Sequence, residues 1–509
     1  MAKSAGANKR NDENKINPGI KITLIAVAVL CVVMLAYSLV TSLGILDRST
    51  TAMTVGEEKI SVTELKQYYQ TARTNVISQY GYYLAMYGYD YTNPAFDGMS
   101  CMFDSTITWK QYFTEEAQAA AQEISILYQE SQKAGYTMTE EDKANLDTYM
   151  ESLDAAAEEA GMSTAKYVSR VYGNGAKVSD VEAYQTKRVI ASGYYKTVLE
   201  SFGIDDAKID AYYGENAEDY DVLKYYLYDV TYETFKYDAD STEEGAPTSE
   251  EDAKQKTDAA KAAAKAEAEA VLAKLKADGS NFDEVCAINE GKDVASFATT
   301  YAETVVSEAD KDTAIGAWLL DSARKAGDME VVEDDSSFSV LLYVGRGLSD
   351  EYTVSVRHIL RLTETAGAEA TDEEKAEIEV ANAEAKLRAE SLLGEWKAGE
   401  ATEESFAQLA KENSEDGSAN AGGLYEGVYK GQMVAEFEDW CFDESRKPGD
   451  TAVVQTSYGY HVMYFVENEG PKYRTDIKNT MEAEQYNDLL GELIEEYETV
   501  ISDKAEILM

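Results

Sequence analysis

The chain has 509 residues, of which 44% are hydrophobic, and 95 acidic side chains against 46 basic ones give a net charge of −49. This length and apolar content exclude disorder throughout and predict about three domains. So large a negative charge disfavours nucleic acid as a partner, because the phosphate backbone would be repelled. Two histidines and four scattered cysteines lack the spacing of zinc sites, so we expect neither a metal nor a cofactor.

Residues 22–46 form an uncharged stretch of 25 residues, ITLIAVAVLCVVMLAYSLVTSLGIL. As a helix, such a stretch crosses the hydrocarbon core of a bilayer, which is about 30 Å thick. The preceding tail, residues 1–21, carries five basic and two acidic side chains. The positive-inside rule then predicts a cytoplasmic N-terminus, a single-pass cell-membrane anchor at 22–46, and an extracytoplasmic location for the rest. A cleaved signal peptide is the alternative, disfavoured because the stretch is long and no clear cleavage site follows.

Residues 47–219 are expected to form a helical domain. Ser61 with Glu64, and Ser179 with Glu182, have the spacing of a capping box, which predicts a helix start at each. Between them, residues 79–96 are rich in tyrosine. These rings either pack between helices, which we favour, or form an exposed cluster able to bind unfolded chains.

The next two segments, 220–346 and 347–469, are expected to be two copies of one α+β domain. A constant offset of 122 residues superimposes identical residues across a helix, a turn and a strand. The matching pairs are Trp318 and Trp440, Asp321 and Asp443, Arg324 and Arg446, Gly327 and Gly449, Asp328 and Asp450, and Val340 and Val462. Residues 470–509 carry an apolar helical stripe, which we expect to pack back on the 47–219 region; a dimer contact is the alternative.

Both histidines lie in the second copy, within the β-branched runs VSVRHILRL and TSYGYHVMYFV. Either histidine alone would be read as a core residue. We expect the two runs to be neighbouring strands, where His358 and His461 could hydrogen-bond. Met433 and Phe437 lie between them at helical spacing, and for either of these ordinary core packing is an equal alternative.

Residues about 350–468 resemble a parvulin, the PpiC-type peptidyl-prolyl cis/trans isomerase domain. The resemblance rests on five motifs in order: H-I-L, S-E-D with S-A-N and G-G, G-Q-M-V-x-E-F-E, G-D, and T-x-x-G-Y-H. The whole chain is similar to exported foldases of the PrsA and SurA type, with a SurA-N-like helical domain. The resemblance implies catalytic roles for His358, His461, Asp416 and Thr456, and substrate binding by Met433, Phe437, Tyr425 and Gln432. Two positions depart from the family pattern, Tyr425 in place of a leucine and Glu426 in place of a glycine.

The first copy is expected to be catalytically silent, since the offset puts Ser339 opposite His461 and a looser match puts Tyr232 opposite His358. The resemblance implies a membrane-anchored foldase that isomerises X-Pro bonds of unfolded or partly folded exported proteins. A non-catalytic holdase chaperone with a structural parvulin domain is the alternative. A metallohydrolase is disfavoured because the chain has no H-E-x-x-H motif.

Overall fold

The computed structural model describes residues 34, 43–173, 175–238, 246–278, 281–367 and 370–503. They belong to two compact units, and each is described by itself. Unit 1 contains the described residues up to Gly203 and those from Glu482 onward, and unit 2 is Ile204–Met481. The predicted anchor at 22–46 lies almost entirely outside the described residues. No helix in the described part of the chain combines the length and the hydropathy needed to cross a bilayer.

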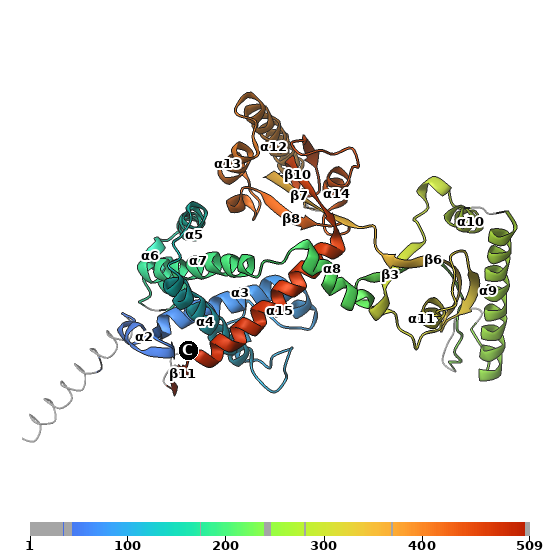
Figure 1. The fold of residues 1–509 in the computed structure, drawn as a ribbon, viewed down its shortest axis with the longest axis horizontal. Coiled ribbons are helices and arrows are strands. Elements are labelled where there is room, and N and C mark those ends of the chain that lie inside the picture. Colours follow the sequence, from blue (N-terminus) through green and yellow to red (C-terminus); the bar gives the residue numbers. More distant parts are fainter. Residues whose placement is uncertain are drawn as a thin grey trace, which may run out of the picture. The chain divides into compact units, whose positions relative to one another are not determined.

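Unit 1 is a helical bundle with one small sheet (Figure 1). The sheet is three-stranded, in the order β11-β1-β2, in a region that the sequence predicted to be mainly helical. A core of aromatic and aliphatic side chains joins the sheet to the first long helices. The elements are α2 (Ile45–Ser49), β1 (Thr51–Val55), β2 (Glu58–Ser61), α3 (Val62–Met86), α4 (Trp109–Ala134), α5 (Glu140–Glu159), α6 (Thr164–Val171), α7 (Val178–Ser201) and β11 (Thr499–Ile501).

One of the two predicted helix starts is correct. The Ser61 hydroxyl accepts a hydrogen bond from the backbone N–H of Glu64 at 3.1 Å, and α3 begins at the next residue. The second start is wrong, because α7 begins at Val178 and Ser179 lies inside its first turn. The carboxylate of Asp180 accepts from the backbone N–H of Lys177 at 2.9 Å. This bond stabilises the first turn two residues before the predicted pair of Ser179 and Glu182.

The C-terminal segment packs on the bundle of unit 1, but it is not a single helix. Helix α15 (Lys472–Glu496) ends before the apolar stripe does, and Val500 and Ile501 lie in β11, which pairs antiparallel with β1. The Tyr486 hydroxyl donates to Glu123 and the Tyr497 hydroxyl donates to Glu130, both at 2.6 Å. The chain turns into a strand because β1 otherwise presents an unpaired edge.

The tyrosine-rich stretch divides between the two alternatives. Tyr80, Tyr89 and Tyr91 pack against the aromatic core of unit 1. Tyr82, Tyr83 and Tyr87 instead project from the end of α3, with exposed fractions of 78%, 52% and 68%. The expectation of packing is therefore correct for half of the rings only.

Unit 2 contains two four-stranded sheets with the same strand order, β4-β3-β6-β5 and β8-β7-β10-β9. The repeat predicted from the sequence therefore corresponds to two copies of the same fold. The first copy consists of β3 (Asp221–Thr231), α9 (Glu250–Asp278), α10 (Phe282–Asn289), β4 (Tyr301–Val305), α11 (Ala314–Leu319), β5 (Met329–Glu333) and β6 (Ser337–Leu348). The second consists of β7 (Tyr352–Leu362), α12 (Asp372–Ala398), α13 (Glu403–Asn413), β8 (Leu424–Val428), α14 (Ala435–Cys441), β9 (Thr451–Gln455) and β10 (Gly459–Pro471). Helix α8 (Asp206–Glu215) precedes them.

The residues that carry the repeat make the same bonds in both copies. The guanidinium of Arg324 donates to the carbonyl of Trp318 at 3.1 Å, and that of Arg446 donates to the carbonyl of Trp440, also at 3.1 Å. Each guanidinium lies over the indole ring, at 3.9 Å and 4.3 Å from its centre. The repeated residues therefore hold the turn between a short helix and the following strand.

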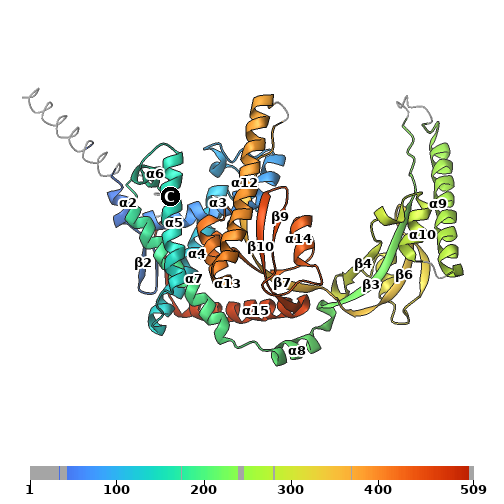
Figure 2. The ribbon, with the colours of Figure 1, turned by 90° about the horizontal axis from the view of Figure 1, so that it is seen from above.

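Helices cover both faces of the second sheet (Figure 2). Ile359 and Val462 face α12 and α13, and Val356 and Met463 face α14. Because side chains alternate along a strand, the residues at even spacing from Val356 and Met463 share the α14 face. The two histidines of the chain occupy such positions.

Candidate active site

The strand register brings the two histidines together. His461 on β10 pairs with Leu360 on β7, and Met463 pairs with His358, so the histidines are diagonal neighbours on one face. Their Nδ1 atoms are 3.0 Å apart, and their ring centres 5.2 Å apart at an interplanar angle of 23°. Only 1% of His358 and 5% of His461 is exposed. The predicted contact between two imidazoles more than a hundred residues apart is therefore present.

Polar groups satisfy the outer nitrogen of each imidazole. On the His461 side, the Thr456 hydroxyl lies 2.9 Å from Nε2. On the His358 side, Nε2 lies 3.2 Å from the Ser418 hydroxyl and 3.2 Å from Oδ1 of Asp416. Ser418 in turn donates to Asp416 at 2.5 Å. A continuous chain of hydrogen bonds thus runs from Thr456 through both rings to Asp416.

With one proton on each ring, this geometry determines which nitrogen carries it. A carboxylate only accepts, so His358 donates from Nε2 toward Asp416 and Ser418. Its Nδ1 is then an acceptor, and the proton between the rings belongs to Nδ1 of His461. The Nε2 of His461 must therefore accept, and the Thr456 hydroxyl donates to it. Every ring nitrogen of the pair then has at least one partner of the right kind.

The pKa shifts agree with this assignment. Burial, together with the neighbouring His358, lowers the pKa of His461 to about 4, so that imidazole is neutral at physiological pH. The hydrogen bonds that Asp416 accepts from His358 and Ser418 hold the pKa of its carboxyl far below the usual range. The site holds a neutral His461 beside His358, with an ionised carboxylate at the far end.

Aromatic side chains enclose the imidazoles. Phe437 on α14 presents its ring edge-on to both, at 5.4 Å from each ring centre, and only 3% of it is exposed. Tyr425 on β8 stacks on His358 at 5.0 Å, and its hydroxyl donates to Asp416 at 3.0 Å. Burial and that hydrogen bond raise the pKa of Tyr425 to about 12, so it stays a donor. Met433 is half-buried in the same apolar cluster.

Gln432 does not join this group. Its side chain is exposed, and its carbonyl accepts from the backbone N–H of Tyr429 at 3.2 Å, which stabilises the turn after β8. Conversely, sequence reasoning gave no role to Ser418, which bridges His358 and Asp416. The S-A-N part of the loop motif was the available signal, since a hydroxyl two residues after an aspartate commonly bonds to it.

Glycine at position 423 lets the loop lie directly against β7. The residue has a φ of +69°, and a Cβ there would come within 2.1 Å of the carbonyl oxygen of His358. Its own carbonyl accepts from the backbone N–H of His358 at 2.8 Å. A side chain at Gly423 would therefore push away the strand that carries the first imidazole.

Comparison with known proteins agrees with the geometry. Residues 338–469 match the family described as the PPIC-type PPIASE domain, a range that begins in β6 and includes β7 to β10. The chain contains a PpiC-type domain. Foldase protein PrsA of Geobacillus sp. (strain WCH70) is 40% identical over 83 residues, covering 16% of this chain and 29% of that protein. Foldase protein PrsA of Exiguobacterium sibiricum is 28% identical over 111 residues, covering 19% and 36%.

Among solved structures, PrsA from Bacillus subtilis is similar at 26% identity, covering 28% of this chain and 48% of that chain, with a TM-score of 0.19. The alignments to the curated relatives span about a third of their length, 29% and 36% for the two PrsA proteins above. The similarity to these relatives therefore concerns part of each chain.

The first copy lacks the imidazole pair of the PpiC-type domain. Its Ser339 takes the position of His461, and the β3 and β6 register pairs Ser339 with Asp229 and Leu341 with Leu227. Leu227, not Tyr232, therefore occupies the place of His358; the looser sequence match was wrong because it ignored the register. The Ser339 hydroxyl donates to the Asp229 carboxylate at 2.5 Å, and Leu227 packs in an apolar cluster.

Proposed function

We propose that this protein is a membrane-anchored, extracytoplasmic peptidyl-prolyl cis/trans isomerase that assists the folding of exported proteins. The observation that carries the proposal is the buried, hydrogen-bonded imidazole pair beneath Phe437, within a PpiC-type domain. The similarity to PrsA foldases supports the foldase part. The uncharged residues 22–46 and the basic tail before them support the anchor.

Catalysis of prolyl isomerisation requires only a lower barrier to rotation about the X-Pro amide bond. The X-Pro amide resists rotation because twisting breaks nitrogen–carbonyl resonance, at a barrier of about 18–20 kcal/mol. In the proposed mechanism Phe437 and Met433 hold the proline ring, and the apolar surroundings remove water from the polar planar amide. The histidine pair, with Thr456 and Asp416, forms a hydrogen-bonded polar floor whose fixed dipoles suit the twisted form better than the planar one.

An isomerase assay on the full chain tests the proposal. The His461→Ala variant removes one ring and leaves His358 without its Nδ1 partner, so we expect the catalysed rate on a proline peptide to fall about tenfold or more. Ser339→Ala provides the matched control, because this residue takes the equivalent strand position in the first copy. Its isomerase rate should equal that of the wild type. Equal rates for His461→Ala and wild type would refute the catalytic role of the pair.

A holdase function has its own supporting observation. Tyr82, Tyr83, Met86 and Tyr87 form an exposed aromatic patch at the C-terminal end of α3. Large apolar side chains gathered on a surface are typical of protein-binding sites. The rings could bind apolar segments of unfolded clients without a strict sequence requirement.

Crosslinking from the patch separates the two functions. We expect a photo-crosslinker at Tyr82 to capture an unfolded client in both wild type and His461→Ala. A matched crosslinker at Glu158, an exposed position on α5, should capture much less. Equal capture from the two positions would refute client binding by the patch. If the wild type has no isomerase activity but still captures clients, only the holdase function remains supported.

A further inference from the structure

A large cleft in unit 2 lies outside the imidazole site. It has a volume of about 880 Å³, in the range of ligand-binding clefts. Its floor is the linker Ser349–Glu351, which joins β6 of the first copy to β7 of the second. Residues of both copies line it: Tyr226, Thr299, Tyr301 and Glu303 on one wall, and Tyr352, Lys430 and Phe442 on the other.

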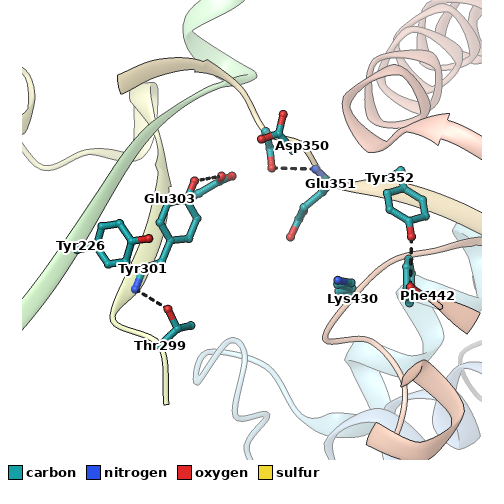
Figure 3. Close-up of a pocket in the computed structure, with 10 residues that line it drawn as sticks. Tyr226, Thr299, Tyr301, Glu303, Asp350, Glu351, Tyr352, Lys430 and Phe442 are labelled. Atoms are coloured by element: carbon teal, nitrogen blue, oxygen red, sulfur yellow. Dashed lines mark hydrogen bonds between the residues drawn. The ribbon is translucent and has the colours of Figure 1, made fainter. Parts of the chain in front are cut away.

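Both walls are aromatic (Figure 3). On one side the rings of Tyr226 and Tyr301 meet edge to face, with centres 5.4 Å apart. On the other side Tyr352 and Phe442 meet in the same way, also at 5.4 Å. Aromatic faces attract cations as well as apolar groups. One wall already makes such a contact, because the ammonium of Lys430 lies 5.7 Å from the ring centre of Phe442.

The cleft is also anionic. Three carboxylates line it, those of Glu303, Asp350 and Glu351, against the single ammonium of Lys430. Lys224 pairs with Asp350 at 3.1 Å and also with Glu303 at 3.9 Å, which leaves the three carboxylates in excess over Lys224 and Lys430. Glu303 also accepts from the Tyr301 hydroxyl at 2.6 Å. The exposed side chain of Glu351 makes no hydrogen bond or ion pair with any other described residue, and Figure 3 places it between the aromatic pairs. Carboxylates beside aromatic faces form a site for a cation.

We infer that this cleft binds a lysine or arginine side chain of an extended, unfolded polypeptide. The cation would lie between the aromatic walls and pair with Glu351 and Glu303, while the stem of the side chain packs on the rings. A peptide fits better than a free amine because the cleft is larger than one ammonium group and is lined by apolar ring surface. The net charge of −49 would draw basic segments toward it. The identity of the peptide as a folding client rests on the proposed function, but the chemistry of the cleft does not.

Binding of a labelled peptide to the full chain tests the inference. The probe is an unstructured, proline-free peptide with several lysines, followed by fluorescence anisotropy at low and at physiological salt. We expect the double variant Glu303→Gln/Glu351→Gln to weaken binding about threefold or more, with a smaller salt dependence. The amide of glutamine can still accept from Tyr301, so the wall is preserved. The same peptide with norleucine in place of lysine should bind the wild type more weakly.

The control is Glu250→Gln/Glu269→Gln, which removes the same two charges from exposed positions on α9, in the same copy but outside the cleft. Its affinity should match that of the wild type. Equal weakening by both variants, or equal binding of the lysine and norleucine peptides, would overturn the inference. Because the probe contains no proline, this outcome is separate from that of the isomerase assay: an inactive wild type that still prefers the lysine peptide refutes only the proposed function.

Discussion

Thr456 is the most informative position at which to test the hydrogen-bond chain. Its hydroxyl is buried, lies 2.9 Å from Nε2 of His461, and also accepts from the backbone N–H of Tyr458 at 3.1 Å. The substitution Thr456→Val replaces the hydroxyl by a methyl group of similar size. It opens no large cavity and leaves the β-branched shape that suits a strand end.

The expected cost follows from the groups left unpaired. A buried acceptor without its donor costs about 1–3 kcal/mol. We therefore expect the free energy of unfolding of unit 2 (Ile204–Met481) to fall by about 2 kcal/mol, which corresponds to about 4 °C in Tm for a unit of this size. The isomerase rate should also fall, since nothing then fixes the proton of His461 on Nδ1.

Urea denaturation, the isomerase assay and nitrogen NMR together measure these effects. The chain has two histidines, so a sample labelled with ¹⁵N-histidine reports both tautomers without overlap. The wild type should contain one imidazole protonated at Nε2 and one protonated at Nδ1. Thr451→Val on β9 is the matched control, because no hydrogen bond of its hydroxyl is seen among the described residues; its stability should change by less than about 0.5 kcal/mol. Two imidazoles both protonated at Nε2, or unchanged stability and rate in Thr456→Val, would refute the chain.

Three further predictions concern backbone space, an orphan donor and acid. Gly423→Ala should lower the free energy of unfolding by about 2 kcal/mol or more and impair isomerisation, because the added Cβ would come within 2.1 Å of a carbonyl oxygen of β7. Gly427→Ala is the control, since its φ is +65° but its nearest neighbour atom is 4.0 Å away; it should cost about 1 kcal/mol in parallel denaturation curves. The buried indole N–H of Trp440 has no partner among the described residues, whereas that of Trp318 in the first copy donates to Glu330 at 2.8 Å. Ala452 takes the place of Glu330 in the second copy, so Ala452→Glu should supply the missing acceptor and raise Tm. An unchanged or lower Tm contradicts this. Acidification should destabilise unit 2 between pH 6.5 and about 4, because folding lowers the pKa of His461 from 6.5 to about 4 and so disfavours the protonated form that the unfolded chain adopts. The contribution of His461 to the free energy of unfolding, about 3 kcal/mol, is fully present above pH 6.5 and is lost as the pH falls to about 4. Urea denaturation at each pH should show this dependence in the wild type and not in His461→Ala.

Much of the second copy could be predicted from the sequence because its signals are local or repeated. Apolar alternation around His358 and His461 predicted two strands, and the offset of 122 residues predicted a second copy of the same fold. Helix starts and strand ends depend on individual side-chain bonds, and there the sequence was less reliable. The start of α7 depends on a hydrogen bond to Asp180 and not on Ser179. Strand β11 forms by pairing with the edge of β1, which would otherwise leave backbone groups unpaired.

Tertiary structure alone decided the parts of the site that depend on strand register and loop packing. Strand register decides whether Leu227 or Tyr232 takes, in the first copy, the position that His358 has in the second. A slip of one residue would move every side chain of the strand to the other face. The role of Ser418 and the separate position of Gln432 depend on how a loop folds over β7, where Gly423 permits a close approach. Periodicity in a sequence fixes which face a residue occupies along its own strand, whereas the contacts between strands, loops and copies arise only when distant segments pack together.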